Sequence, residues 1–136
     1  MDTVVLEVHT GREAGTFDLT PDIAAFVAGR GDGLVNVFVP HATAGIAIIE
    51  RGAGSEFDLI EVIDHLLPRV DRVYRHRHGS EGHGADHVLP AFVPPSTSIP
   101  VLGGVMALGT WQSVLLVDTN VDNLVRQVRL SFLTSG

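Results

Sequence analysis

The sequence predicts an α+β fold, a mostly antiparallel β-sheet or sandwich with two helices, in a single domain that spans residues 1–136. Short runs rich in β-branched residues recur along the chain, and only two stretches have residues typical of helix starts and helix ends. These helices stand between runs of strands without the regular βαβ alternation of a parallel sheet. A length of 136 residues with 45% hydrophobic and 18% charged residues is typical of one globular domain.

The first half of the chain predicts three strands and a helix. Alternating apolar residues indicate a strand over 4–8. The stretch 20–31, TPDIAAFVAGRG, predicts a helix, because proline suits the first helical position and glycine ends helices. Two β-branched runs, 33–40 and 45–50, predict strands joined through the short segment HATA.

The stretch 55–68, SEFDLIEVIDHLLP, predicts the second helix, with Ser55 at a capping position and an apolar stripe on one face. Beyond it the pattern is typical of strands. Gly103 and Gly104 fit a tight hairpin turn between two of them. The last third is therefore predicted to be a β-meander, with strands near 86–93, 98–102, 104–108, 111–118 and 124–133.

Composition excludes several kinds of chemistry. The chain has no cysteine, so disulfides and thiolate ligands are excluded, and it has no lysine, so a Schiff base is excluded. A net charge of −7 argues against nucleic-acid binding. The N-terminus lacks the pattern of a signal peptide, and no apolar run is long enough to span a membrane. We therefore expect a cytoplasmic protein without membrane or nucleic-acid partners.

The segment 75–87, RHRHGSEGHGADH, holds four of the seven histidines. His83 and His87 would align only on a helix, and the glycines between and before them argue against one. The pattern predicts a glycine-rich loop that enters a strand at His87. Because any metal must be held by His, Asp or Glu, the cluster is a candidate metal site, and a solvated polar loop is the alternative.

His41 and Glu50 are further candidates. His41 lies between an apolar strand and a small-residue turn whose backbone amides could approach a ligand closely. Glu50 follows the apolar run IAII, where an acid either ends the strand in solvent or faces a pocket.

Three blocks of sequence together resemble the YjbQ-like family, described as secondary thiamine-phosphate synthases. They are PHATAGIAIIE at 40–50, GHGADHVLPAFVPPSTSIPV at 82–101 and GTWQSVLLVD at 109–118. The resemblance implies a compact α+β trimer that joins a pyrimidine diphosphate to a thiazole phosphate and releases pyrophosphate. A small phosphorylated molecule is then the expected ligand, no organic cofactor is expected, and a divalent metal, zinc or magnesium, would assist.

The resemblance also implies roles for individual residues. His41, Glu50 and His87 fall on the family's site positions and are the candidate catalytic residues. His41 and His87 are expected to share one ligand. The histidine-rich segment adds His83, so that His41, His83 and His87 are the candidate metal ligands; the extra histidines at 76, 78 and 83 would make the site more metal-like than in its relatives or compensate for missing polar groups. The candidate substrate-binding residues are Thr43, Ser96, Trp111, Gln112 and Arg126.

Two departures from the family pattern remove polar groups. Ile49 stands where the family usually has asparagine, and Leu89 stands where it usually has lysine. Either the site is rebuilt or its activity is altered. Two functions from different classes therefore stay open, a transferase of this kind and a protein that binds a metal or small anion without catalysis.

Arg126 interrupts an apolar face in the strand predicted over 124–133, where Leu124, Val128, Leu130 and Phe132 share its face by period two. A charge buried without a partner costs several kcal/mol, so a specific partner is expected. The alternatives are an ion pair with Asp118 or Asp122 and a phosphate group of the substrate.

Overall fold

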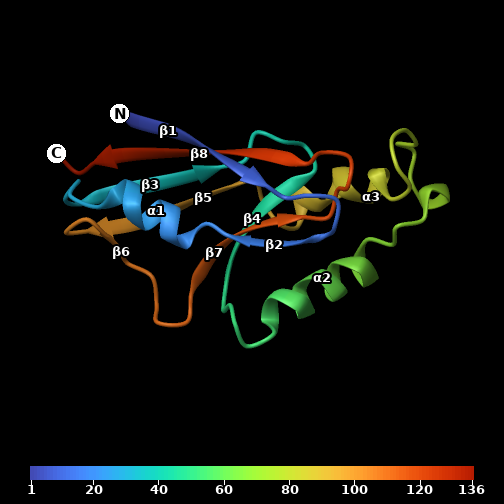
Figure 1. Cartoon of the computed structure of the whole chain (residues 1–136), viewed down its shortest axis with the longest axis horizontal. Helices are drawn as coiled ribbons and strands as arrows, with labels where there is room; N and C mark the ends of the chain where they lie inside the picture. Colours follow the sequence, from blue (N-terminus) through green and yellow to red (C-terminus); the bar gives the residue numbers. More distant parts are fainter.

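The computed structural model describes all 136 residues and contains two antiparallel sheets. The larger sheet has five strands in the order β1-β8-β3-β5-β6, and the smaller has three in the order β2-β7-β4 (Figure 1). The strands of the larger sheet are β1 (Asp2–His9), β3 (Gly33–Phe38), β5 (Ser96–Leu102), β6 (Val105–Met106) and β8 (Val125–Thr134). Those of the smaller sheet are β2 (Gly15–Asp18), β4 (Ala44–Ile49) and β7 (Ser113–Asp118).

Three α-helices and two 3₁₀ turns complete the fold. They are α1 (Thr20–Val27), α2 (Ser55–Leu66), η1 (Asp71–Val73), α3 (His83–Val88) and η2 (Leu89–Ala91). In Figure 1 the helix α2 lies below the sheets, and α3 lies at the end of the molecule far from both termini. No helix combines the length and the apolar character that a membrane crossing would need.

Two apolar cores hold these layers together. The larger core joins the inner faces of the two sheets and α1, with Val37, Ile46, Val114 and Leu130 among its fully packed side chains. The smaller core lies beside Val117 of β7 and joins α2 and α3 to the sheet. Strand β7 is therefore buried on both faces, which explains its unbroken apolar run VLLV.

The α+β sandwich predicted from sequence is confirmed, and most elements lie where expected. The two-residue turn at Gly103 and Gly104 is confirmed, because Leu102 pairs with Val105 and both glycines have positive φ. The alternation in β8 is also confirmed, since its buried positions are 126, 128, 130 and 132, but Leu124, predicted on the same face, lies before the strand and is exposed.

Several local predictions were wrong. The strand predicted over 86–93 is instead α3 and η2, so the chain has three α-helices. The four-residue strand β2 was missed. The last third is not a meander, because β7 joins the smaller sheet while β5, β6 and β8 stay in the larger one. Ser55 is the first residue of α2 and makes no capping hydrogen bond, and Gly54 occupies the N-cap.

Candidate metal site

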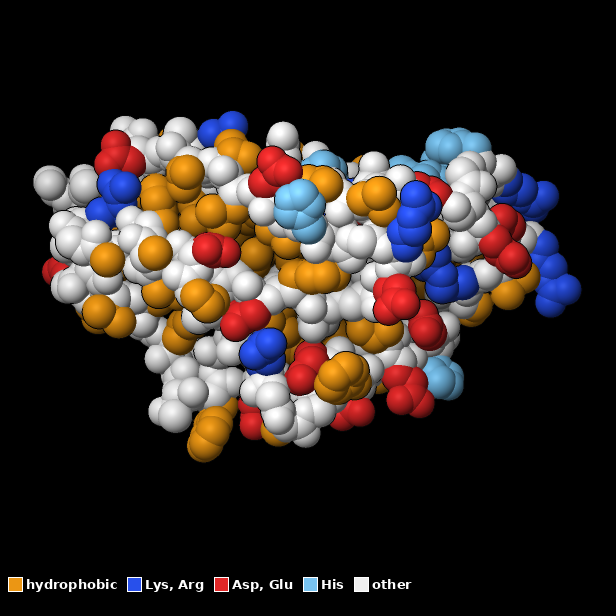
Figure 2. Space-filling model, in the orientation of Figure 1, with side chains coloured by type: hydrophobic (Ala, Val, Ile, Leu, Met, Phe, Trp, Pro, Cys, Tyr) orange, Lys and Arg blue, Asp and Glu red, His pale blue; other side chains and the backbone are white.

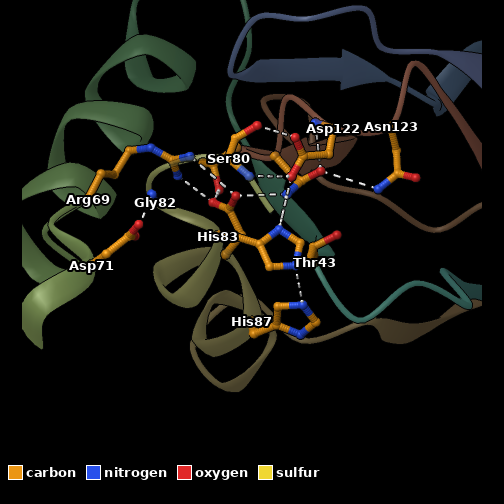
Figure 3. Close-up of polar contacts among 12 residues, drawn as sticks. Thr43, Arg69, Asp71, Ser80, Gly82, His83, His87, Asp122 and Asn123 are labelled. Carbon is orange, nitrogen blue, oxygen red and sulfur yellow. Dashed lines mark hydrogen bonds and ion pairs between the residues drawn. The ribbon is translucent and has the colours of Figure 1, made fainter. Parts of the chain in front are cut away.

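Helix α3 places His83 and His87 one turn apart on the same face, with their Nε2 atoms 2.9 Å apart. His76 approaches from the segment that precedes the helix. His76, His83 and His87 each contribute one ring nitrogen to a group of three nitrogens that lie within 4.8 Å of one another. Figure 3 shows His83 between His87 on one side and Asp122 on the other.

Two glycines make this approach sterically possible. A side chain at Gly84 would meet the carbonyl oxygen of His76 at 2.7 Å and the Cβ atom of Tyr74 at 2.8 Å. At Gly79 it would lie 2.9 Å from the ring of His83, and Gly79 has φ +80. These glycines therefore allow the chain to cross closely over α3, and this use of glycine explains why the sequence reading of a glycine-rich loop without a helix was wrong.

Asp122 orients the ring of His83. The Oδ2 atom of Asp122 lies 3.0 Å from His83 Nδ1, and Ser80 donates to the same carboxylate through both its backbone N–H and its hydroxyl. A carboxylate can only accept, so His83 donates its Nδ1–H and its Nε2 carries a lone pair. In proteins, metal-binding histidines commonly have a carboxylate in this position.

Asp86 anchors α3 to the loop after β7. Its buried carboxylate accepts hydrogen bonds from Arg69, from Thr119 Oγ1 at 2.7 Å and from Asn120 Nδ2 at 2.9 Å. Asn120 Nδ2 also lies 3.2 Å from His83 Nδ1. The helix that carries two of the histidines is therefore held in a fixed orientation by a buried, fully paired acid.

The surroundings of His76 and His87 favour their neutral forms. The pKa of His87 is lowered first by burial and then by its proximity to His76, His83 and His78, with Asp86 opposing. Burial and the neighbouring rings of His78 and His83 also lower the pKa of His76. Hydrogen bonds from Ser80 are the largest cause of the lowered pKa of Asp122. Neutral imidazoles beside an ionised carboxylate are the state that binds a metal.

We predict that the metal-free protein loses stability as the pH falls below about 6.5, the ordinary pKa of histidine. Because the folded state lowers the pKa of His76 and His87, the unfolded chain binds more protons in this range. Urea unfolding of chelator-treated protein at pH 7.5 and 5.5 should give a smaller free energy of unfolding at the lower pH.

The double variant His76→Ala/His87→Ala should show a flatter dependence on pH. A residual slope of the same sign is expected from His41, whose pKa is also lowered, first by burial and then by Arg126. A slope as steep as that of the unchanged protein would contradict this assignment.

The geometry fits a transition-metal ion. Tetrahedral zinc with bonds of about 2.0–2.1 Å to histidine nitrogens separates those nitrogens by about 3.3 Å. The observed 2.9 Å between the Nε2 atoms of His83 and His87 needs only a small outward adjustment. His76 can supply a third ligand, because its Nδ1 is shielded from solvent and has no hydrogen-bond partner. Three protein ligands leave a fourth position for another group.

His41, predicted both as a catalytic residue and as a metal ligand, is not one of these three ligands. Its Nε2 accepts the backbone N–H of Gln127 at 3.0 Å. Burial is the largest cause of the lowered pKa of His41, the charge of Arg126 lowers it further, and the charge of Asp118 opposes the change. The histidine cluster contains His76 and not His41, and the role predicted for His41 stays a prediction. Within the single chain no hydrogen bond or ring contact joins His41 to His87, and their sharing of a ligand stays a prediction.

Thr43 and Arg126 meet at a buried ion pair. Arg126 donates from Nε and Nη2 to the two oxygens of Asp118, at 2.6 and 2.9 Å, and from Nη2 to Thr43 Oγ1 at 2.8 Å. Asp118 is one of the two protein partners predicted for Arg126. Its Oδ1 also accepts the N–H of Asn120, and Asn120 Oδ1 accepts the N–H of Asp122, so the ion pair and the histidine cluster share one polar network.

The other predicted site residues lie apart from this network. Glu50 follows β4 and makes no hydrogen bond or ion pair. Ser96 lies on β5 and accepts from Asn36 Nδ2 at 3.0 Å. Trp111 is 73% exposed on the loop between β6 and β7, and Gln112 Oε1 accepts from Gly109 N at 2.7 Å, which closes that loop. No hydrogen bond in the chain joins these residues to the histidines.

The sequence did not predict that His76 joins His83 and His87, or that Asp122, Ser80 and Asn120 surround His83. The signal for His76 and His78 was present, because residues two apart share a face in an extended segment. No local pattern could find Asp122 or Asn120, because they reach His83 from a loop far along the chain.

Fold and site together define a small α+β sandwich protein with a histidine cluster against the loop that follows β7. The chain belongs to the YjbQ-like family, since the family model described as UPF0047 protein YjbQ-like matches residues 4–135. It is 62% identical over 133 residues to UPF0047 protein Rv2556c of Mycobacterium tuberculosis, covering 98% of each chain. Identity to UPF0047 protein YugU of Bacillus subtilis is 30% over 116 residues, covering 83% of this chain and 86% of YugU.

Solved structures show the same fold. The crystal structure of hypothetical protein APE1520 from Aeropyrum pernix K1 superposes with a TM-score of 0.88 at 30% identity, covering 99% of this chain and 100% of that one. None of these three names states an activity, so a proposal about function depends on the site.

Proposed function

We propose that this protein binds one divalent transition metal, with zinc the best fit, through His76, His83 and His87, and uses it on a small phosphorylated molecule. The observation that carries the proposal is the convergence of three histidine nitrogens within 4.8 Å, with Asp122 behind one of them. Imidazole ligands favour zinc, copper or nickel, whereas magnesium prefers oxygen ligands. Zinc therefore replaces magnesium as the expected metal.

Positive charge beside the cluster supports an anionic ligand. Arg72, Arg75 and Arg77 are exposed, and none of them forms an ion pair, although the chain as a whole is acidic. Figure 2 shows arginine side chains gathered at the end of the molecule near α3, close to pale-blue histidines. A local excess of arginine attracts phosphate groups, and the remaining acidic surface repels them.

The reaction that fits this site best is the one expected from the family, the joining of a pyrimidine diphosphate to a thiazole phosphate. A bound metal would supply charge neutralisation at the departing pyrophosphate. Exposed arginines would position the phosphate groups. Arg126 is not free for this task as it stands, because its Nε and Nη2 already bind Asp118 and Thr43. The homotrimer stays a prediction.

Metal analysis tests the first part of the proposal. We expect chelator-treated protein to bind one zinc ion per chain, and zinc-loaded protein to bind inorganic pyrophosphate at least about tenfold more tightly than metal-free protein, a difference of about 1.4 kcal/mol. Mixing both expected substrates should then release pyrophosphate in a coupled assay.

The outcomes separate the two functional classes. Zinc binding without pyrophosphate binding would favour a non-catalytic metal-binding protein. Absence of stoichiometric zinc, copper or nickel would overturn the metal site altogether.

A further inference from the structure

His78 lies beside the three proposed ligands without belonging to their set. Its ring centroid is 4.0 Å from that of His76 and 4.9 Å from that of His83. Both separations are similar to those among the ligands, which run from 4.1 Å for the His76–His87 pair to 5.1 Å for the His76–His83 pair, whereas the ring of His87 is farther from His78, at 6.4 Å. The set of nitrogens within 4.8 Å nevertheless excludes His78. Its ring is close enough to reach a metal after a rotation of its side chain.

No hydrogen bond holds the His78 ring. The side chain is exposed and contacts only the neighbouring imidazole rings, whereas His83 is held by Asp122 and by His87. In the segment before it, Arg77 Nε donates to the carbonyl oxygen of Tyr74 at 2.8 Å. His78 therefore lies beside the cluster with a side chain that no hydrogen bond prevents from turning.

We propose that His78 is an exchangeable fourth ligand, which closes the metal site in the absence of a phosphorylated ligand and leaves when that ligand binds. This inference rests on the proposed metal site. A catalytic zinc keeps one position for water or substrate, and a structural zinc is closed by four protein ligands. A fourth histidine that makes no hydrogen bond can bind the metal or leave it, so one site can be either closed by four protein ligands or open to a phosphorylated ligand.

The proposal predicts two linked effects of the variant His78→Ala. If His78 occupies the metal for about nine-tenths of the time, only about one-tenth of the molecules are open to an anion, and pyrophosphate binds about tenfold more weakly than it otherwise would. The same equilibrium strengthens metal binding by about tenfold. Removing His78 should therefore weaken metal binding and strengthen pyrophosphate binding by matching factors.

Cobalt-substituted protein provides the test. We expect His78→Ala to change the visible absorption spectrum of bound Co²⁺, to raise the Kd for Co²⁺ about tenfold and to lower the Kd of the cobalt-loaded protein for inorganic pyrophosphate about tenfold. His65→Ala is the matched control, because His65 is an exposed histidine on α2 whose ring bonds only to the carbonyl oxygen of Glu61. It should match the unchanged protein in all three measurements.

Each other outcome overturns a specific statement. Identical results for His78→Ala and His65→Ala would remove His78 from the metal. Weaker cobalt binding without stronger pyrophosphate binding would make His78 a permanent ligand and overturn the exchange. No cobalt binding by the unchanged protein would overturn the metal site itself, and the role of His78 with it.

Discussion

Replacing His83 with alanine should weaken zinc binding more than 100-fold, because loss of a direct ligand exceeds the tenfold to 100-fold loss that is typical of an outer partner. His87→Ala should have an effect of the same size. Both residues supply Nε2 atoms from one face of α3, where these atoms lie 2.9 Å apart. Competition with a chromogenic chelator would measure the two affinities.

Asp122→Asn should have a smaller effect, a loss of about tenfold to 100-fold in zinc affinity. An amide in place of the carboxylate can offer its N–H₂ group to His83 Nδ1, which would favour the tautomer whose Nε2 is protonated and unable to bind the metal. The order of zinc affinities among these variants thus distinguishes the loss of a metal ligand from the loss of a group that orients a ligand. His65→Ala should bind zinc normally, and circular dichroism should confirm that every variant is folded.

Equal zinc affinity in His83→Ala and His65→Ala would contradict the metal site. A loss in Asp122→Asn as large as that in His83→Ala would contradict the assignment of Asp122 as an orienting group and make it a candidate ligand instead.

Much of the fold could be predicted because local patterns and burial agree in most strands. The alternation in β8 predicted which side chains are buried, including Arg126, and the structure confirms it. The apolar run in β7 predicted a strand but could not show that both of its faces are covered. The missed strand β2 has only four residues, all of them half-buried, so it lacks an alternation that a pattern could detect.

The candidate site could be predicted only in part, because its geometry depends on tertiary contacts. Spacing showed that His83 and His87 would align on a helix, but the propensity of the neighbouring glycines predicted a loop. The buried acid Asp86 and its partners Arg69, Thr119 and Asn120 hold that helix, and these contacts override the weak helical propensity. A single sequence carries no signal for contacts between such distant residues.

Replacing Arg126 with methionine should lower the free energy of unfolding by about 3–5 kcal/mol, the usual cost of breaking a buried ion pair. Both partners are 1% exposed, and the two-pronged contact leaves Asp118 uncompensated when the guanidinium is removed. Urea unfolding would measure the loss. Arg129→Met is the matched control on the same strand, because Arg129 is exposed and bonds only to Thr3 Oγ1, and it should change stability by less than about 0.5 kcal/mol.

The double variant Arg126→Met/Asp118→Asn decides what the ion pair does. If the pair is structural, removing both charges leaves no unpaired charge in the core, so the double variant should be less destabilised than the sum of the two single variants. Asparagine keeps an oxygen that can accept the N–H of Asn120, and the network through Asp122 toward His83 therefore survives. A stable Arg126→Met protein with weakened binding of a phosphate ester would instead assign the arginine to the ligand, and strictly additive losses would show that Arg126 and Asp118 stabilise the fold independently of each other.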